Sequence, residues 1–339
     1  MDAGIDDVPQ FPRVIRVRAF PRIHVGLLDL GDATHRRHGG AGFTLAGPAL
    51  EVAAEESDHL LVEGLSRLDE RARREVRRAL AELQETTGPL RTRIAVEQTM
   101  PPHVGLGSKT ALLLAVLQAA SLAGGRRLDA PALQRLSGRG GTSGVGINTF
   151  FTGGFVTDGG HPAAPGRPHA PSSASRPDAG PPVLCRLDIP AAWRFTLLVH
   201  PSQSIADEAE RRLFADSTPV PECEVLRAIS VMYHGVVAAV ATADLALLGT
   251  AMDELHRTGF KRCELAAQAE SIRAMYARVR DAGSAVGLSS VGPLLYVVSS
   301  EAAPDVPATL EGLARRHGFH CLGTFGPRNA GFEVLERAP

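Results

Sequence analysis

The sequence predicts an α+β fold, in which helices alternate with short strands, and not a doubly wound parallel sheet. Segments with alternating apolar residues and segments with the helical period follow one another along the 339 residues. The segment 162–182 consists largely of Pro, Ala, Ser and Gly, which is typical of a flexible loop between domains. We therefore expect a flexible N-terminus over residues 1–13, a first domain over 14–185 and a second domain over 186–335.

The first half is predicted to contain one amphipathic surface helix, over residues 66–86. This helix would bury Leu68, Val76, Leu80 and Leu83 on one face. Its arginines are interleaved with glutamates, which indicates a solvated face and not a nucleic-acid contact. Further helices are expected at 109–123 and 130–138, strands at 14–20, 23–30, 91–98 and 150–158, and a glycine-rich connector at 39–45 that leads into another strand.

The second half is predicted to alternate in the same way. A pair of strands should flank the turn Val291-Gly292-Pro293. Strands are expected at 193–200, 285–290, 294–299 and 319–325, and helices at 204–215, 224–242, 243–256, 261–280 and 304–317.

The composition limits the functional classes that need to be considered. The apolar fraction of 44% is ample for a core, and a net charge of −1 gives no general attraction to nucleic acid or an anionic membrane. No run of 18 apolar residues is present, so no transmembrane helix is expected, and the acidic N-terminus lacks the apolar segment of a signal peptide. Scattered cysteines without C-x-x-C spacing argue against a zinc site or disulfides and fit a reduced, cytoplasmic location. They are Cys185, Cys223, Cys263 and Cys321.

A glycine-rich turn at residues 101–110 leads directly into an apolar helical pattern. Such a junction points several backbone N–H groups at the positive end of a helix dipole, which favours a phosphate or pyrophosphate. Only two of the 36 basic residues are lysines, Lys109 and Lys261, so a lysine inside this turn stands out. The spacing matches neither a P-loop nor a dinucleotide motif, and the alternative is a tight turn whose glycines serve packing. The predicted binding residues are Gly105, Leu106, Gly107, Ser108, Lys109 and Thr110.

A second glycine-rich turn covers residues 138–146. Its backbone can form an anion-binding nest, and its arginine can hold a phosphate with two parallel hydrogen bonds. A flexible turn is the alternative. Two such loops in one domain predict a substrate with phosphate groups at two separate ends. The predicted contacts of the second loop are Arg139, Gly140, Gly141, Thr142 and Ser143.

Carboxylates and histidines at strand ends supply candidates for proton transfer and metal binding. Asp29 and Asp158 could help to hold Mg²⁺ that is bound mainly through substrate phosphates, and the alternative for both is a turn cap. His24, in the strand before Asp29, is either catalytic or a core histidine. Further candidate substrate contacts are His161, which follows Asp158, and His200, Gln203 and Ser204 at a strand–helix junction.

The motif Pro101-x-x-x-Gly105-Leu106-Gly107-Ser108 resembles the central motif of the GHMP kinase superfamily. Four ordered segments resemble one branch of it, the β-ribofuranosylaminobenzene 5′-phosphate synthases: IHVGLLDLG (23–31), GGAGFTLAGP (39–48), PPHVGLGSKT (101–110) and GRGGTSGVGINTFFTGGFVTDGGH (138–161). The resemblance spans residues 14–161 and continues more weakly to about residue 326. It implies a GHMP-kinase-like two-domain fold, with a ribosomal protein S5 domain 2-like N-terminal domain and a ferredoxin-like C-terminal α/β sandwich.

The resemblance also implies a reaction. The family transfers the ribosyl group of phosphoribosyl pyrophosphate to an aromatic carboxylic acid and releases CO₂ and pyrophosphate. The first loop, Lys109 and Mg²⁺ would then hold the pyrophosphate, and Arg139 with residues 140–143 the 5′-phosphate. His24 would assist deprotonation or position the acceptor, and Asp29 would bind Mg²⁺ or a ribose hydroxyl. A homodimer is expected, because such assemblies are common.

Two positions of the first glycine-rich turn bear on the identity of the acceptor. The chain has lysine at position 109, where the family more often has glycine, and alanine at position 111, where it more often has glutamine. Rich in arginine, alanine and proline, it is similar to members that make C-nucleoside antibiotics of the formycin or pyrazofurin type. This similarity implies 4-amino-1H-pyrazole-3,5-dicarboxylate as acceptor. Alternatives are 4-aminobenzoate or 4-hydroxybenzoate, an ATP-dependent GHMP small-molecule kinase, and a non-catalytic protein that binds a phosphorylated metabolite.

Overall fold

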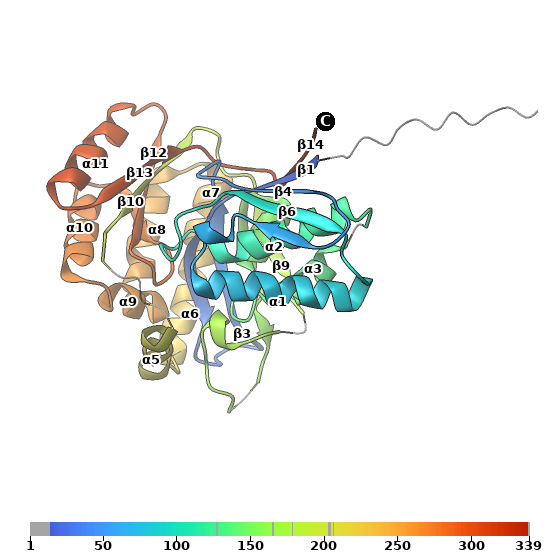
Figure 1. Cartoon of the computed structure of the whole chain (residues 1–339). Coiled ribbons are helices and arrows are strands. Elements are labelled where there is room, and N and C mark those ends of the chain that lie inside the picture. Colours follow the sequence, from blue (N-terminus) through green and yellow to red (C-terminus); the bar gives the residue numbers. More distant parts are fainter. Residues whose placement is uncertain are drawn as a thin grey trace, which may run out of the picture.

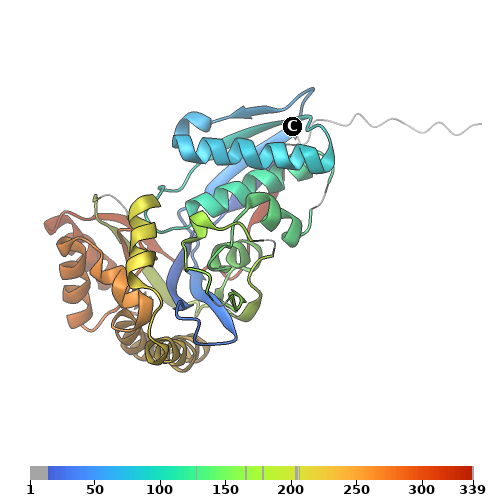
Figure 2. The same ribbon diagram turned by 90° about the horizontal axis from the view of Figure 1, so that it is seen from below.

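The computed structural model of the chain shows an α+β molecule built on three sheets (Figures 1 and 2). The predicted flexible N-terminus lies outside the part that is described. Elements of the first half lie at one end of the molecule and most of those of the second half at the other (Figure 1). The described residues are 14–126, 128–164, 166–177, 179–202, 205 and 207–337.

The first sheet has the strand order β14-β1-β4-β6-β5 and packs against helix α2 (Ser108–Ala123). Helix α2 is apolar all round and buried from Thr110 to Ser121, as expected of a helix enclosed between other elements. Strand β14 comes from the end of the chain and pairs antiparallel with β1 at its beginning. The strands are β1 (Val14–Ala19), β4 (Leu50–Glu56), β5 (Leu61–Glu63), β6 (Thr92–Gln98) and β14 (Glu333–Arg337).

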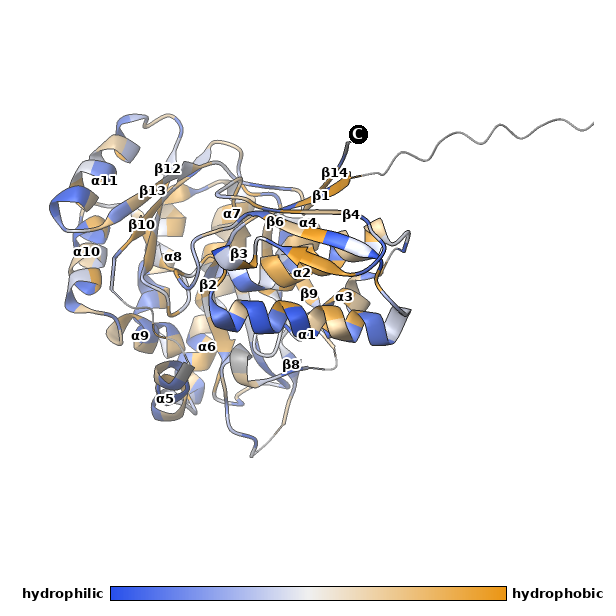
Figure 3. Cartoon of the chain, in the orientation of Figure 1, coloured by the Kyte–Doolittle hydropathy of each residue, from blue (hydrophilic) through white to orange (hydrophobic). Residues whose placement is uncertain are grey.

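Helix α1 (Glu70–Thr87) covers the outer side of α2 and confirms the predicted amphipathic helix. Asp69 caps its N-terminus by accepting the Ala72 N–H at 2.8 Å. The predicted apolar face, including Val76, Leu80 and Leu83, is buried. The opposite face is hydrophilic (Figure 3) and carries ion pairs between its arginines and glutamates. A 3₁₀ turn, η1 (Leu65–Arg67), precedes it.

The second sheet places the strands that carry most of the predicted site residues. Its order is β2-β3-β7-β9, with β8 paired to β3. The ring of Phe43 lies 4.8 Å from that of Phe155 and 5.3 Å from that of Phe195, which joins this sheet to the core of the second half. The strands are β2 (Arg22–Asp29), β3 (Arg36–Thr44), β7 (Phe155–Asp158), β8 (His161–Pro162) and β9 (Val183–Leu187). The expected domain division after residue 185 falls within β9.

The strand predicted at 150–158 is only partly correct. Residues up to 152 belong to helix α4 (Val145–Thr152), and strand β7 begins at Phe155. A short apolar run does not distinguish a buried helix from a buried strand. Gly153, with φ of +60°, ends the helix in a conformation that favours glycine. The remaining helix of this half, α3 (Ala130–Ser137), agrees with the prediction.

The third sheet, ordered β11-β12-β10-β13, is covered by helices on both faces. α10 and α11 enclose one core against it, and α8 lies on the other side. The strands are β10 (Trp193–Val199), β11 (Ala285–Leu288), β12 (Leu294–Ser300) and β13 (His320–Phe325), and the helices are α8 (Leu245–His256), α10 (Glu270–Asp281) and α11 (Asp305–Arg316). The single helix predicted over 261–280 is wrong: α9 (Gly259–Ala266) ends before α10, and Ala269 between them is extended.

The remaining helical run, residues 222–242, contains α6 (Glu222–Val231), the π-helical segment η3 (Met232–Val237) and α7 (Ala238–Thr242). By length and composition alone it could cross a membrane, which corrects the expectation that no segment would qualify. Its side chains Ala228, Met232, Val236 and Val240 belong to the core shared with the third sheet, so a core helix accounts for its apolar character. Helix α5 (Asp207–Ser217) precedes this run.

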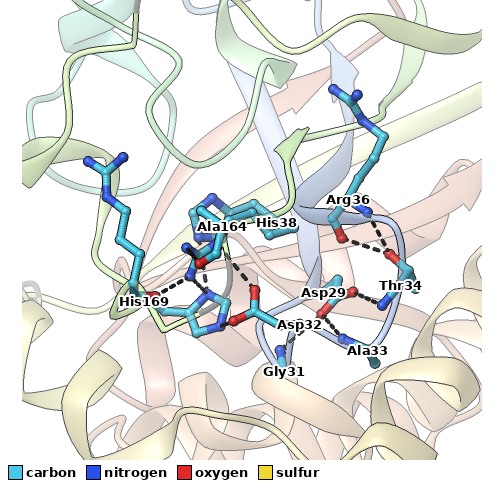
Figure 4. A network of polar contacts seen from close by, with 11 residues as sticks. Asp29, Gly31, Asp32, Ala33, Thr34, Arg36, His38, Ala164 and His169 are labelled. Atoms are coloured by element: carbon cyan, nitrogen blue, oxygen red, sulfur yellow. Dashed lines mark hydrogen bonds and ion pairs between the residues drawn. The ribbon is translucent and has the colours of Figure 1, made fainter.

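The described parts of 162–182, predicted to be a flexible loop, make specific contacts. The Arg37 guanidinium donates to the carbonyl of Arg167 at 2.8 Å and lies 2.9 Å from Nδ1 of His169, which is buried. Figure 4 shows His169 beside His38 and Asp32. Arg176 pairs with Glu82 on α1. A short 3₁₀ turn, η2 (Ser172–Ala174), lies in this segment.

Candidate active site

The first glycine-rich loop runs into the N-terminus of α2, as predicted. Gly107 caps the helix in the left-handed conformation, with φ of 72°. Gly105 has φ of +110°, and a Cβ atom there would lie 2.6 Å from the Ser289 carbonyl oxygen. Glycine is therefore required at this position by both backbone conformation and space. The N–H groups of the first turn of α2 have no intrahelical partners and can bind an anion.

The second glycine-rich loop also ends at a helix N-terminus, that of α4. The Ser143 hydroxyl donates to Asp158 Oδ2 at 2.9 Å, and the Gly144 N–H donates to the same oxygen at 3.0 Å. Gly141 packs against the described part of the 162–182 segment, since a Cβ there would lie 2.7 Å from the Ser175 carbonyl oxygen. This loop is thus largely buried and held on both sides.

The two loops border two adjoining cavities, one of about 80 Å³ and the other of about 200 Å³. The smaller is lined by residues of the second loop, by His24 and by an apolar wall. The larger is lined by Gly105, Gly107, Ser108 and Lys109 of the first loop. Both cavities share the residues Arg22, Thr110, Arg139, Ser172, Glu210, Ser290 and Val291. The folded chain therefore brings the two predicted anion loops together at one site.

Two arginines lie where the cavities meet. Arg139 Nε donates to Thr110 Oγ1 at 3.2 Å, and burial lowers the pKa of Arg139. Arg22 Nη1 donates to the Gly105 carbonyl oxygen at 2.8 Å, while its Nε finds no hydrogen-bond partner within the described chain. Burial, with a contribution from Arg139, lowers the pKa of Arg22 to about 10. Arg22 was missed by the sequence analysis, because nothing in one sequence separates it from the other arginines.

Lys109 lines the larger cavity and is ion-paired to α1. Its Nζ donates to Glu75 Oε1 at 3.2 Å, and both side chains are about one-fifth exposed. Burial lowers the pKa of Lys109, although Glu75 opposes the shift. Burial raises the pKa of Glu75, but Lys109 and Arg139 outweigh this effect, so its pKa is lowered. Glu75 is therefore a further neighbour of the site, and the sequence alone did not identify it.

His24 is buried on β2 and faces the smaller cavity. Its Nδ1 has no hydrogen-bond partner among the described residues. Burial, followed by Arg22 and Lys261, lowers its pKa well below the ordinary value, so the ring is neutral near pH 7. The backbone N–H of His24 donates to Ser289 Oγ at 3.0 Å, and that hydroxyl donates to the Gly105 carbonyl oxygen at 2.7 Å. His24 is thus joined to the first loop.

The two aspartates proposed as metal ligands have the geometry of turn caps. The Asp29 carboxylate accepts backbone N–H groups of Gly31, Ala33 and Thr34 at 2.9–3.2 Å (Figure 4). Asp158 is held by Ser143, Gly144 and the N–H of Gly160, and burial raises its pKa to about 6. Within the described ranges, no group of three or more His, Cys, Asp or Glu side chains could hold a metal ion. The metal role of both aspartates remains a prediction.

Of the other predicted substrate contacts, His161 lies beside the second loop and His200 lies away from both cavities. His161 Nε2 lies 2.8 Å from the Gly140 carbonyl oxygen, at the second loop. His200 lines neither cavity: its ring packs 4.9 Å from that of Phe319, and its Nδ1 accepts the Ser202 N–H at 3.1 Å. Gln203 and Ser204 lie outside the described residues.

Residues from the second half complete the site and were not predicted. Ser290 and Val291, from the turn between β11 and β12, line both cavities. Glu264 on α9 lines the smaller cavity beside Lys261, the second of the two lysines. The rarity of lysine in the sequence was a signal for Lys261, but its position could not be inferred without the packing of α9 on β2.

Comparisons with known proteins agree with this architecture. Residues 74–154 match the GHMP kinases N terminal domain. The chain is 34% identical over 322 residues to a beta-ribofuranosylphenol 5′-phosphate synthase of Archaeoglobus fulgidus, covering 95% of this chain and 99% of the relative. A synthase of the same name from Methanothermobacter thermautotrophicus is 33% identical, with coverages of 84% and 88%.

Solved structures of small-molecule kinases share the fold. Homoserine kinase from Cytophaga hutchinsonii superposes with a TM-score of 0.65 at 17% identity, over 98% of this chain and all of that one. Phosphomevalonate kinase from Streptococcus pneumoniae gives 0.69 at 11% identity, over 92% and 99%. The predicted GHMP-kinase-like α+β fold is confirmed. With a relative 34% identical along nearly its whole length, the chain belongs to the β-ribofuranosylphenol 5′-phosphate synthase family, within the GHMP kinase superfamily.

Proposed function

We propose that this protein is a C-ribosyl synthase that couples phosphoribosyl pyrophosphate to an aromatic or heteroaromatic carboxylic acid, with loss of CO₂ and pyrophosphate. The observation that carries the proposal is the convergence of two anion loops on adjoining cavities that share Arg22, Thr110 and Arg139. A donor with pyrophosphate at one end and phosphate at the other requires two such loops. The names of the relatives support the same class of reaction.

The donor is proposed to span the two cavities. The first loop and Lys109 hold the pyrophosphate, and Arg139 with Gly140–Ser143 holds the 5′-phosphate, because these groups supply N–H donors and positive charge. The ribose then lies where the cavities meet. The acceptor is then assigned to the part of the smaller cavity that the 5′-phosphate leaves free, on the side of C1′ away from the pyrophosphate, from which it has to approach to displace that group.

The chain's own residues supply positioning and electrostatic stabilisation. Lys109 neutralises the charge that develops on the departing pyrophosphate. A ring carbon of the acceptor forms the new bond to C1′, and loss of its carboxylate as CO₂ restores aromaticity. Enclosure of both reactants excludes water that would otherwise hydrolyse the donor. His24, as a neutral imidazole, is proposed to position the acceptor.

Mg²⁺ remains part of the proposal only as an ion that accompanies the donor phosphates. The carboxylates of Asp29 and Asp158 do not suit it, because their oxygens already accept backbone and hydroxyl hydrogen bonds. A metal ligand role for these aspartates would require rearrangement of both turns.

For the acceptor, we propose an electron-rich ring acid, with 4-amino-1H-pyrazole-3,5-dicarboxylate as the first choice. The alternative is 4-hydroxybenzoate or 4-aminobenzoate, which the phenol in the names of the relatives favours. All of these carry a carboxylate and a group that donates electrons to the ring. Arginines, carboxylates and apolar side chains line the smaller cavity, and these groups suit either ring.

The decisive experiment incubates the protein with phosphoribosyl pyrophosphate, Mg²⁺ and each of these acids. We expect a coupled C-riboside 5′-phosphate by mass spectrometry, with equal amounts of pyrophosphate and CO₂. Release of ADP from ATP with a small alcohol, and no coupling, would instead indicate a kinase. Tight binding of the donor without turnover of any acceptor would indicate a non-catalytic binding protein.

A further inference from the structure

The smaller cavity contains a buried carboxylate that the phosphates of the donor do not explain. Two carboxylates line it: Glu210 on α5, which is half-buried, and Glu264 on α9, which is 1% exposed. The donor proposed for this site is polyanionic at both ends. A carboxylate deep in such a cavity repels phosphate, so it needs a ligand group that donates a proton or a hydrogen bond.

Glu264 is held in place by an ion pair that leaves it available to a ligand. Lys261 Nζ lies 2.9 Å from Oε2 of Glu264 but directs its hydrogen bond to the Leu288 carbonyl oxygen at 2.6 Å. Oε2 of Glu264 is buried beside Lys261 and accepts no hydrogen bond of good geometry from the described residues, while Glu264 as a residue lines the cavity. A buried ion pair is weak evidence for stability, because desolvation opposes it. A carboxylate with spare acceptor capacity at a cavity wall therefore points to a role in binding or proton transfer.

The rest of the cavity wall includes apolar side chains that suit a ring. Apolar side chains of Leu27, Ile147, Phe214 and Val291 line it together with Glu264. Arg22, whose Nε lacks a partner in the described structure, and Arg139 lie toward the first loop, where both cavities meet. Because Arg139 is assigned to the 5′-phosphate, the carboxylate of a flat acid is assigned to Arg22 and the opposite end of its ring to Glu264.

We propose that Glu264 is the base that accepts the proton of the acceptor's electron-donating group, a hydroxyl, amino or ring N–H conjugated to the attacked carbon. Lys261 is the positioning residue that holds this carboxylate. The inference rests on the proposed C-ribosyl transfer. It names a catalytic residue and restricts the substrate to acids whose donating group carries a proton.

The step balances for 4-hydroxybenzoate as follows. The lone pair of the para oxygen moves into the ring, the carbon that bears the carboxylate forms a bond to C1′, and the C1′–O bond breaks with its electron pair on pyrophosphate. The hydroxyl proton passes to Glu264. The bond to the carboxylate then breaks, its electron pair restores the aromatic ring, and CO₂ leaves. Glu264 returns the proton to the oxygen, so the carboxylate is regenerated.

The test compares Glu264→Gln with wild type on two acceptors at one pH near 8. The acceptors are 4-hydroxybenzoate, whose hydroxyl is protonated, and 3,5-difluoro-4-hydroxybenzoate, which is already ionised. We expect Glu264→Gln to lose about 100-fold or more in kcat on the first acceptor, the ordinary scale of proton-transfer catalysis. On 3,5-difluoro-4-hydroxybenzoate we expect no loss of kcat. This acceptor has no hydroxyl proton to remove, and the variant lacks the negative charge that repels its phenolate.

The matched control is Glu301→Gln, which makes the same change at an exposed glutamate paired with Arg194. It should alter neither rate by more than about 2-fold. Calorimetry with phosphoribosyl pyrophosphate and thermal unfolding show whether the Glu264 variant is folded and binds donor. An equal loss on both acceptors, as expected for a carboxylate that binds only the ribose hydroxyls, would overturn the inference.

A wild-type comparison keeps the inference testable if the variant does not fold. The acceptor 4-methoxybenzoate donates electrons but has no proton to lose, so wild type should couple it at least about 100-fold more slowly than 4-hydroxybenzoate. Equal rates would contradict the role of Glu264. If wild type couples no acid at all, the proposed function fails, which is a different result from coupling that is insensitive to the acceptor's proton.

Discussion

The two predicted anion loops differ in how firmly the fold holds them. The second loop is buried at Gly140, Gly141 and Thr142 and is fixed from behind by the carboxylate of Asp158. The first loop is only partly buried along Gly105–Lys109, except at Leu106. Both end at helix N-termini, so the difference lies in their surroundings and not in the kind of site they form.

The positively charged side chains of the two loops also differ in how firmly they are held. No carboxylate of the described residues lies within ion-pair distance of Arg139, which bonds to Thr110 instead. Lys109 is paired with Glu75 and has to leave it, or share it, to reach a ligand. The second loop is thus a fixed clamp suited to binding, and the first carries a mobile charge suited to a group whose charge changes during the reaction.

Removal of the Lys109 charge should have the largest effect on the rate of coupling. Lys109→Ala is expected to lower kcat of coupling by about 100-fold to 1,000-fold, because the developing pyrophosphate charge loses a preorganised partner. Donor affinity should change much less. Arg74→Ala, which removes an exposed arginine from α1, is the control and should be near wild type. Steady-state kinetics with calorimetry measure both quantities, and a near-normal rate for Lys109→Ala would remove this lysine from the mechanism.

Removal of the Arg139 side chain should instead weaken binding of the donor. Arg139→Ala is expected to raise the Kd for phosphoribosyl pyrophosphate by about 30-fold or more, since a buried charge that binds phosphate is lost. Arg135→Ala, at an exposed arginine of α3, should leave the Kd unchanged. Calorimetry measures the change. Unchanged donor affinity in Arg139→Ala would show that the second loop does not hold the 5′-phosphate.

The sequence was informative about these loops because their signals are local. Glycines before a helix N-terminus, together with one of only two lysines, predicted an anion site, and the structure places Thr110 and Arg139 of the two loops 3.2 Å apart. The alternation of strands and helices likewise predicted most elements. Errors arose where local pattern is ambiguous, as in the apolar run that is helix α4 and then strand β7.

What could not be predicted depends on contacts between distant segments. Arg22, Glu75 and Glu264 reach the site from β2, α1 and α9. No spacing rule connects such residues along the chain. The same limit applies to Asp29 and Asp158, for which the sequence left a turn cap and a metal ligand equally open. Only the positions of the neighbouring N–H groups favour the turn cap.

Because the second loop buries Asp158, the stability of the protein should depend on pH. Burial raises the pKa of Asp158 to about 6, whereas an unfolded aspartate has a pKa of about 3.9. The folded state therefore binds this proton more strongly, and its contribution to stability is present below about pH 4 and lost as pH rises through 6. Urea unfolding of wild type and Asp158→Asn at pH 4.5 and pH 7 should show a difference in unfolding free energy that changes with pH. A difference independent of pH would mean that Asp158 titrates normally.

The smallest effect is expected at Asp29, whose carboxylate accepts only backbone N–H groups of its own turn and, like Asp158, lines neither cavity. Asp29→Asn keeps one carboxamide oxygen but loses the second acceptor, so we expect about 1 kcal/mol less stability and little change in kcat. A metal ligand would behave differently: activity would fall, and higher Mg²⁺ would restore part of it. Thermal unfolding and a Mg²⁺ titration of the coupling rate measure both. A large, Mg²⁺-dependent loss of rate in Asp29→Asn would show that the turn opens during turnover, and that the first half contributes a metal ligand after all.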